Sequence, residues 1–158
     1  MNRQPAITTR GLTKHYGAVV AVDGLDLTVG PGEVYGFIGR NGAGKTTTIR
    51  MLLGLVVPTD GEVEIHGEPV RPGATAWLAR IGSLVETAAA YRNLTVAENL
   101  EIHRRLTRTA AGRVAAVVER LQLGPVSRRR HDQLSLGNRQ RVGLAQALLR
   151  EPSMLILD

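Results

Sequence analysis

The sequence predicts an α/β protein that begins with antiparallel strands, continues with a strand, a glycine-rich loop and a helix, and then contains a helical insert. Three observations carry this prediction. Apolar residues alternate along residues 6–29, a glycine-rich loop precedes a helix-forming segment at residues 39–46, and residues 93–124 show helical spacing without a strand pattern. With 158 residues and 43% hydrophobic content, the chain is long enough to bury the core of one domain.

Residues 6–29 have the pattern of three antiparallel strands. Ile7 opens the first, residues 19–22 form the second, and residues 25–29 alternate apolar and polar side chains in the third. Glycines at turn positions separate them. Tyr16 lies in the turn at residues 14–17, where an aromatic ring can stack on a nucleobase or simply pack against the turn.

The segment from Gly39 to Thr46 reads Gly-Arg-Asn-Gly-Ala-Gly-Lys-Thr and matches the phosphate-binding pattern G-x-x-x-x-G-K-[ST]. We expect its glycines at positions 39, 42 and 44 to adopt φ > 0 and bring backbone N–H groups against phosphate oxygens. Lys45 supplies an ammonium for the β- and γ-phosphates, and the Thr46 hydroxyl suits Mg²⁺. Only Lys14 and Lys45 are lysines among the 20 Lys and Arg residues.

The flanks of this loop support the phosphate-binding interpretation. Residues 34–38 predict a short buried strand, and Thr47 to Leu55 predict a helix with Ile49, Leu52 and Leu53 on one side. The order strand, glycine-rich loop, helix is the one the mechanism requires. The helix would then direct its N-terminal N–H groups and positive dipole end at the anion.

A carboxylate follows another predicted strand. After a turn at residues 58–61 and a half-buried strand through residue 65, the apolar segment Ile81 to Val85 predicts a strand that delivers Glu86 at its C-terminal end. Ligands bind at that end of parallel sheets. The plainer alternative is a glutamate in a surface loop.

The following residues predict helices. Thr95 and Glu98 form a capping box, so a helix should run from Val96 to about Arg108, and residues 113–121 predict another. This helical insert shows no chemistry of its own and suits packing or partner contact.

Residues 134–158 add one more helix and one more strand. Ser135 is a good N-cap for a helix whose apolar side chains include Val142 and Ala145, and Pro152 follows its end. Residues 154–157 predict a buried parallel strand that ends at Asp158, where a carboxylate suits a water-mediated contact to Mg²⁺.

The composition of the chain argues against a nucleic-acid-binding protein and against a membrane span. The formal net charge is +6 and the isoelectric point about 10.7, but the arginines are dispersed and aromatic residues make up 3% of the chain. Stacking platforms are therefore scarce, and direct nucleic-acid binding is not expected. The chain has no cysteine and no apolar run near the ~20 residues of a membrane span.

Taken in order, these motifs resemble the ATP-binding subunit of ABC transporters over the whole chain. The resemblance implies a P-loop NTPase core. Tyr16 corresponds to the adenine-stacking aromatic, residues 39–46 to Walker A, Glu86 to the Q-loop, residues 134–140 to the signature motif and residues 154–158 to Walker B. The nucleotide-binding residues so implied are Tyr16, Gly39, Asn41, Gly42, Ala43, Gly44, Lys45, Thr46, Thr47, Ser135 and Gly137.

The resemblance also implies a mechanism. ATP and Mg²⁺ would bind with Thr46, Glu86 and Asp158 near the metal, and Lys45, Glu86 and Asp158 would serve catalysis. Two such domains would pair head to tail, so that Ser135 and the Gly137 N–H contact the γ-phosphate held by the other domain. Transmembrane permease subunits would hold the protein on the cytoplasmic face of the membrane.

The same resemblance divides residues 1–158, as one incomplete ATP-binding domain, into three parts. Residues 1–92 would form the β subdomain and P-loop core, residues 93–150 the helical subdomain, and residues 151–158 the Walker B strand.

Several residues depart from the family pattern. Leu136 and Asn138 replace signature residues, and Glu86 replaces the Q-loop glutamine. These substitutions, together with residues 91–95, are similar to the bacitracin-export and lantibiotic-immunity branch of the family. This resemblance favours export of an antibiotic, peptide or drug. A leucine with φ > 0 would cost roughly 1–2 kcal/mol, so we predict a negative φ at Leu136.

The family places its general-base glutamate directly after the Walker B aspartate, here Asp158. The chain resembles the first half to two-thirds of an ATPase, and we expect it to be inactive in hydrolysis by itself. Two other interpretations stay open: a soluble ABC-type ATPase acting on ribosomes or DNA, and a non-catalytic nucleotide-binding fragment.

Overall fold

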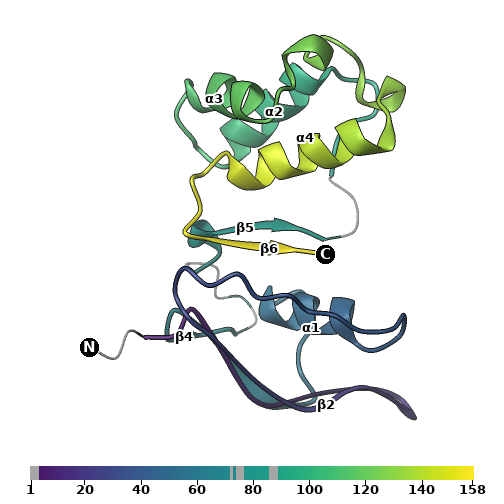
Figure 1. The fold of residues 1–158 in the computed structure, drawn as a ribbon, viewed down its shortest axis with the longest axis vertical. Coiled ribbons are helices and arrows are strands. Elements are labelled where there is room, and N and C mark those ends of the chain that lie inside the picture. The colour runs from purple at the N-terminus through teal and green to yellow at the C-terminus, as the bar shows by residue number, and fades with distance from the viewer. Residues whose placement is uncertain (1–3, 72, 74–76, 86–88) are drawn as a thin grey trace. The chain divides into compact units, whose positions relative to one another are not determined.

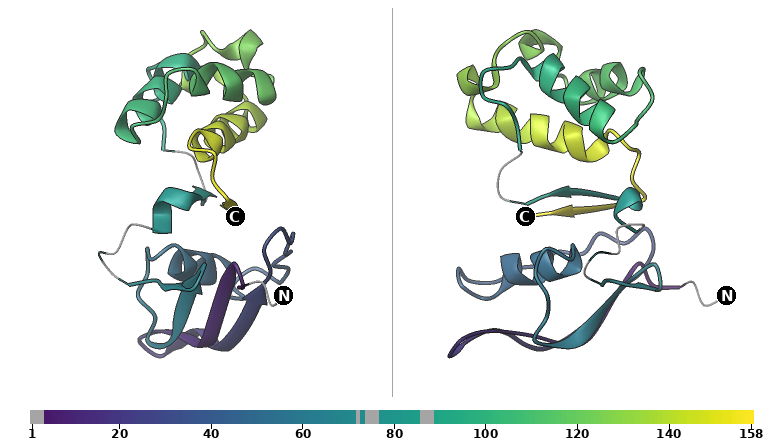
Figure 2. Two further views of the ribbon diagram at one scale, coloured as in Figure 1. Left: turned by 90° about the vertical axis from the view of Figure 1, so that its left-hand side faces the viewer. Right: turned by 180° about the vertical axis from the view of Figure 1, so that it is seen from behind.

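The computed structural model describes residues 4–71, 73, 77–85 and 89–158 (Figure 1). It consists of two compact units, Met1–Leu78 and Ala79–Asp158. The first unit is a β-sheet with one helix, and the second is a helical layer with a two-stranded sheet, as the two further views also show (Figure 2). Each unit is described by itself.

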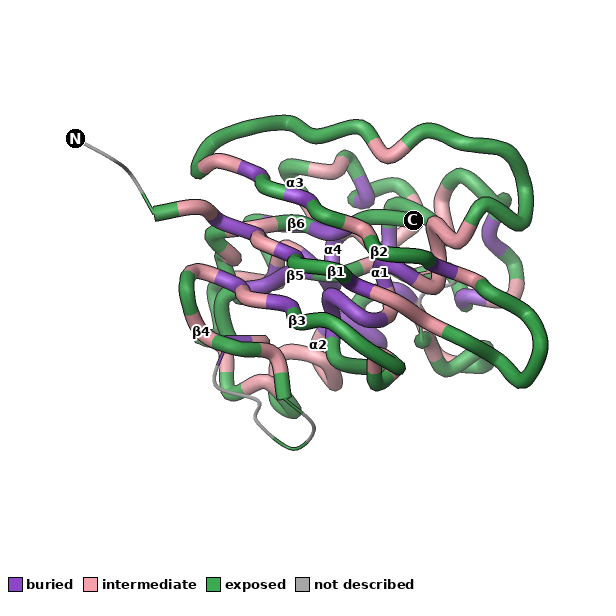
Figure 3. Tube along the Cα trace, turned by 90° about the horizontal axis from the view of Figure 1, so that it is seen from below, coloured by how far each residue is buried: buried purple, intermediate pink, exposed green. Residues whose placement is uncertain are grey.

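The first unit is built on a four-stranded antiparallel sheet in the order β2-β1-β3-β4. The strands are β1 (Ile7–Tyr16), β2 (Val19–Val29), β3 (Asp60–Ile65) and β4 (Glu68–Pro69). Along β3 the first three residues are exposed, and a residue of intermediate burial then separates two buried ones, as the tube coloured by burial shows (Figure 3). Val63 and Ile65 are buried there, which confirms the predicted half-buried strand.

The second and third predicted strands are one strand. β2 continues through Gly24, which adopts φ of 55°, and the pairing with β1 is irregular around Leu12 and Lys14. The Gly24 N–H donates to the Thr13 hydroxyl at 3.0 Å. The glycine therefore accommodates an irregularity inside a long strand instead of a turn, and this prediction was wrong at that point.

The prediction of a buried strand at residues 34–38 was also wrong. These residues have no strand conformation, and Val34 and Ile38 are 99% and 98% exposed. The described residues of the first unit offer them no neighbouring strand, because its sheet is completed by β1 to β4. An apolar segment becomes a strand only when a neighbour pairs with its backbone N–H and C=O groups.

Helix α1 (Lys45–Leu52) covers the sheet of the first unit and contacts β2 and β3. Ile49 and Leu52 are buried, and Leu53 directly after the helix is 3% exposed, as the predicted apolar side requires. Met51 is fully buried beside them.

The second unit contains a parallel pair, β5 (Ile81–Leu84) and β6 (Met154–Leu157), preceded by the 3₁₀-helix Trp77–Arg80. Ile81 pairs with Met154, and Leu84 pairs with Leu157. The predicted parallel strand is confirmed. Its burial is only partial, since Leu155 and Leu157 are exposed and Ile156 is buried, because β6 has one neighbouring strand among the described residues.

Three helices build the rest of the second unit: α2 (Val96–Leu106), α3 (Arg113–Arg120) and α4 (Leu136–Leu148). Two 3₁₀-helices, Gly124–Val126 and His131–Gln133, connect α3 to α4. One apolar cluster joins them, formed by Val96, Leu100, Val117, Leu123, Leu134, Val142, Ala145 and Leu149.

The caps of these helices agree with the sequence. At α2, the Thr95 hydroxyl accepts from the Glu98 N–H at 3.2 Å, and the Thr95 N–H donates to the Glu98 carboxylate at 2.7 Å. The predicted capping box is therefore confirmed. These hydrogen bonds hold the pKa of Glu98 below its usual value.

Among the described residues, no helix combines the length and the apolar character needed to cross a membrane.

Candidate nucleotide-binding site

The glycine-rich loop has two left-handed positions. Gly42 and Gly44 adopt φ of 82° and 83°, as predicted. Gly39 does not, and that part of the prediction was wrong. A side chain at position 39 would instead lie 3.4 Å from the Ala43 Cβ and 3.8 Å from the Lys45 Cδ. Both distances are ordinary van der Waals contacts, so neither space nor backbone conformation requires glycine at position 39, and the turn depends on the other two glycines.

Gly44 is the N-cap of α1 and has no side chain that could cap the helix. The first helical hydrogen bond runs from the Thr48 N–H to the Gly44 carbonyl at 2.8 Å. In the part of the chain that is described, the backbone N–H groups of Lys45, Thr46 and Thr47 have no acceptor. Uncapped N–H groups and the positive end of the helix dipole together favour an anion at this point.

Lys45 folds back over the loop that precedes it. Its ammonium donates to the Gly39 carbonyl at 2.7 Å and to the Arg40 carbonyl at 2.9 Å. The Ala43 N–H also donates to the Arg40 carbonyl, at 3.1 Å. A lysine ammonium has three donors, so one donor of Lys45 stays available for a phosphate oxygen.

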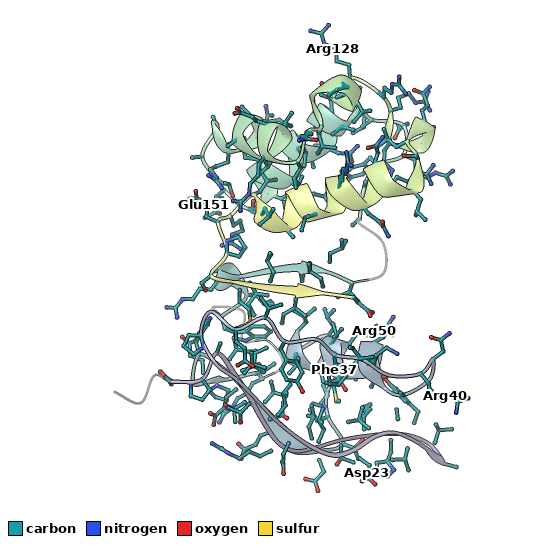
Figure 4. The ribbon with its side chains drawn as sticks, viewed as in Figure 1. Asp23, Phe37, Arg40, Arg50, Arg128 and Glu151 are labelled. Atoms are coloured by element: carbon teal, nitrogen blue, oxygen red, sulfur yellow. The ribbon has the colours of Figure 1, made fainter. Side chains whose placement is uncertain are left out.

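An open hollow of about 370 Å³ lies between β2 and the loop. Its lining combines apolar side chains of β2 with Phe37, which Figure 4 labels, and with the loop backbone. The full lining is Val20, Ala21, Val22, Asp23, Leu25, Phe37, Gly42, Ala43 and Thr48. A wall of mixed polar and apolar atoms beside a glycine-rich loop leaves room for a ligand with a ring at one end and phosphate at the other.

Tyr16 closes β1 next to the Gly17–Ala18 turn and pairs with Val19. Its ring is about half exposed, and the Lys14 ammonium lies 5.1 Å from the ring centroid. The Lys14 ammonium also donates to the Val57 carbonyl at 2.7 Å. Tyr16 is therefore accessible on the same unit as the loop but does not line the hollow, and its stacking role stays a prediction.

The signature segment starts α4 as predicted. The Ser135 hydroxyl accepts from the Asn138 N–H at 3.4 Å, and Leu136 is the first residue of the helix. Leu136 is not among the residues with positive φ, so the predicted conformation is confirmed. Its side chain is 70% exposed. Ser135 and Gly137 are exposed as well, which leaves this helix end accessible to a ligand or a partner.

At the ends of β5 and β6, the Asp158 N–H donates to the Leu84 carbonyl at 2.9 Å. This bond continues the parallel register and places Asp158 at the carboxyl end of the pair. Glu86 lies outside the described residues, so its predicted role is not placed. No group of three His, Asp or Glu side chains suited to a metal occurs among the residues described.

The predicted site residues therefore fall into two sets. Tyr16, residues 39–46 and Thr47 belong to the first unit, while Ser135, Gly137 and Asp158 belong to the second. The loop residues are held together by hydrogen bonds within their own unit.

Sequence reasoning missed one contact and several buried polar side chains. The contact is the Ala21 carbonyl, which would lie 2.2 Å from a Cβ at position 44. The side chains on helices α2 and α4 are Asn99 and Gln146, which are 2% and 8% exposed. A polar residue among the apolar positions of a helix is a signal the sequence does contain, whereas no sequence pattern points to the Ala21 carbonyl.

His131 is a buried histidine beside the signature helix, and burial lowers its pKa, with the charges of Arg139 and Arg92 adding to the effect and Asp132 opposing it. The folded protein therefore prefers neutral His131. The stability that this gives is present above the unfolded pKa of about 6.5 and is lost as pH falls toward the lower folded pKa.

We expect urea unfolding at pH 7.5 and 5.5 to show a larger acid destabilisation in the wild type than in His131→Gln. Both proteins keep the contribution of His103, whose pKa burial also lowers, so it does not affect the difference between them. An equal loss of unfolding free energy in both proteins would contradict the role of His131.

The fold and this loop define a P-loop nucleotide-binding protein. The sequence profile described as "ABC transporter" matches residues 22–158, and the chain belongs to that family.

Curated relatives of the chain support the same family assignment. The chain is 47% identical over 153 residues to the "Bacitracin transport ATP-binding protein BcrA" of Bacillus licheniformis, covering 96% of this chain and 50% of that protein. It is 43% identical over 157 residues to the "Daunorubicin resistance ATP-binding protein DrrA3" of Streptomyces coeruleorubidus, covering 97% and 50%. The chain thus spans about half the length of these relatives.

A solved structure of a dimeric ATP-binding cassette in a post-hydrolysis state, bound to ADP and Pi, matches with a TM-score of 0.85 at 25% identity. The match covers 96% of this chain and 73% of that one. The predicted fold class, an α/β P-loop NTPase core with a β and a helical subdomain, is confirmed.

Proposed function

We propose that this chain binds ATP as part of an ABC exporter subunit that drives an antibiotic, peptide or drug through separate membrane permeases. The observation that carries the proposal is the uncapped N-terminus of α1, with Gly42 and Gly44 in left-handed conformations and Lys45 at its first position. This arrangement offers backbone N–H groups and an ammonium to one anion. The base and ribose would extend toward the hollow beside β2 and toward Tyr16.

Residues of both units fit Mg²⁺ by their chemistry. The Thr46 hydroxyl lies in the first turn of α1, and Asp158 ends β6. Both present hard oxygen donors, which Mg²⁺ prefers, and Glu86 would be a third. Bound Mg²⁺ would neutralise charge on the β- and γ-phosphates. Lys45 and the first-turn N–H groups would orient the same phosphates, which is this chain's own contribution to phosphoryl transfer.

The proposal includes a second ATP-binding domain. Ser135 and the Gly137 N–H stand at the exposed start of α4, where an anion held by another domain can approach. Permease subunits would place this assembly on the cytoplasmic face of the membrane. The division into residues 1–92, 93–150 and 151–158 remains a proposal.

Export of an antibiotic or drug is supported by the relatives, whose names refer to bacitracin transport and daunorubicin resistance. Disrupting the gene in its own host should therefore raise sensitivity to such a compound. Unchanged sensitivity to peptide and anthracycline antibiotics would argue for an ABC-type ATPase with another task, such as one acting on ribosomes or DNA.

Nucleotide binding is tested by calorimetric titration of the protein with MgATP, MgADP and AMP. We expect ATP and ADP to bind and AMP to bind far more weakly, because the loop recognises phosphates beyond the first. Equal affinity for AMP and ATP would show that the glycine-rich loop is not the binding site.

A further inference from the structure

The positive charge of the chain is concentrated in its second unit. Residues 1–78 contain seven Lys or Arg and seven Asp or Glu, whereas residues 79–158 contain thirteen and seven. The first unit is therefore neutral by formal charge, and the second unit carries the whole net charge of +6. A charge asymmetry of this kind between two parts of one chain indicates an anionic partner for the basic part.

Four arginines of the second unit stand on two segments that lie side by side. The Asp132 N–H donates to the Arg92 carbonyl at 3.0 Å, and the Val96 N–H donates to the Arg129 carbonyl at 3.0 Å. These two bonds bring Arg92 close to the arginine run at residues 128–130. All four side chains belong to exposed residues. We call them the arginine patch, which consists of Arg92, Arg128, Arg129 and Arg130.

The turn that carries three of these arginines is held by its backbone. The Arg129 N–H donates to the Val126 carbonyl at 2.9 Å, and the Ser127 carbonyl accepts from the Ala97 N–H, in the first turn of α2, at 3.0 Å. Figure 4 shows Arg128 pointing away from the helices. The arginine side chains are therefore presented to solvent from an ordered turn, in contrast to the basic residues of a disordered tail.

Two carboxylates lie near the arginine patch, and both are already engaged. Asp132 pairs with Arg130 at 2.7 Å, and Glu98 accepts from the Thr95 N–H and from the Thr95 hydroxyl, both at 2.7 Å. Within the part of the chain that the structure describes, no carboxylate pairs with the other three arginines of the patch. The patch therefore keeps an excess of positive charge that a surface rich in phosphate can neutralise.

We infer that the arginine patch docks on the anionic phospholipid headgroups of the membrane. The guanidinium fork matches phosphate in two-point contacts, and clusters of basic residues are attracted to anionic lipid surfaces. Tyr91, next to Arg92, is 59% exposed and is the type of side chain that rests at the headgroup level. It is also the one aromatic residue in the sequence of residues 79–158, which argues against a surface built to stack on single-stranded nucleic acid.

The test is cosedimentation of the protein, without nucleotide, with vesicles of phosphatidylcholine alone and with vesicles of phosphatidylcholine and phosphatidylglycerol in equal parts. The double variant Arg128→Gln/Arg129→Gln removes two charges from the arginine patch and leaves the backbone bonds of the turn in place. Arg105→Gln/Arg108→Gln is the matched control, because it removes two exposed charges at and just beyond the opposite end of α2.

We expect the wild type to bind the anionic vesicles, to lose this binding at high salt and to leave vesicles of phosphatidylcholine alone unbound. Arg128→Gln/Arg129→Gln should bind the anionic vesicles about five- to twentyfold more weakly, while the control variant stays within about twofold of the wild type. Both variants should keep the wild-type melting temperature, since the changed side chains are exposed.

Absence of binding to the anionic vesicles, or equal binding to both kinds of vesicle, would overturn the inference. Equal losses in the two double variants would also overturn it, because the overall charge of the unit would then be responsible. Tighter binding to double-stranded RNA or DNA than to anionic vesicles at equal phosphate concentration, lost in Arg128→Gln/Arg129→Gln, would assign the patch to nucleic acid instead. None of these outcomes requires nucleotide, so they are independent of the proposed function, which the MgATP titration tests.

Discussion

Lys45→Ala is expected to weaken MgATP binding by about ten- to a hundredfold, because it removes a charge-assisted hydrogen bond to phosphate. The change also removes the two bonds from the ammonium to the Gly39 and Arg40 carbonyls, which hold the loop closed over its own backbone. Both effects act in the same direction on nucleotide affinity. Isothermal titration with MgATP measures the loss.

Arg10→Ala is the control for loss of one positive charge. Arg10 lies on β1 and pairs with Glu62 and Glu64 on the exposed face of the sheet, so its removal should leave ATP affinity unchanged. Lys45→Arg should also bind weakly, because a planar guanidinium does not replace a compact ammonium in this loop. Wild-type affinity in Lys45→Ala would exclude the loop as the phosphate site.

What the sequence predicted correctly is mostly local. The capping box at Thr95 and Glu98 and the Ser135 N-cap both depend on residues within one turn of each other. The bounds of α1 were predicted less well, since the helix spans Lys45–Leu52 and not Thr47 to Leu55. Such signals are legible because the groups that interact are neighbours in the chain. The conformation of Leu136 followed from the same reasoning, since a leucine rarely tolerates φ > 0.

What failed depends on distant partners. Residues 34–38 have the composition of a strand, but no described strand of the first unit pairs with them. Gly24 has the composition of a turn, yet β2 continues through it because β1 pairs on both sides of the irregularity. In both cases tertiary pairing, which the local sequence does not encode, decided the outcome.

In the candidate site, too, the local features could be predicted from the sequence and the tertiary contacts could not. The pattern of residues 39–46 predicted the two left-handed glycines and the position of Lys45, because glycine and lysine are required there by local chemistry. The packing of β2 against Gly44 was not predictable, since it depends on a backbone carbonyl that any residue at position 21 would provide.

The packing of β2 against Gly44 predicts the second substitution with a large expected effect. Gly42→Ala and Gly44→Ala both place a Cβ at a left-handed position, at φ of 82° and 83°, which costs roughly 1–2 kcal/mol in each case. A Cβ at position 42 meets nothing within 4 Å, whereas a Cβ at position 44 would lie 2.2 Å from the Ala21 carbonyl oxygen. The two substitutions therefore share the backbone strain and differ in the clash.

We expect Gly44→Ala to lower the melting temperature and the MgATP affinity more than Gly42→Ala does. The Ala21 carbonyl in β2 and the start of α1 are both backbone, and no side chain can rotate away to relieve the clash. The clash is therefore relieved only if β2 or the first turn of α1 moves. Moving that turn displaces the N–H groups of Lys45 and Thr46 from the phosphate position, and affinity is lost together with stability. Scanning calorimetry and MgATP titration of the two variants measure the difference. If Gly44→Ala lost no more stability and affinity than Gly42→Ala, the contact between β2 and the loop would not be what holds the phosphate-binding end of α1 in place.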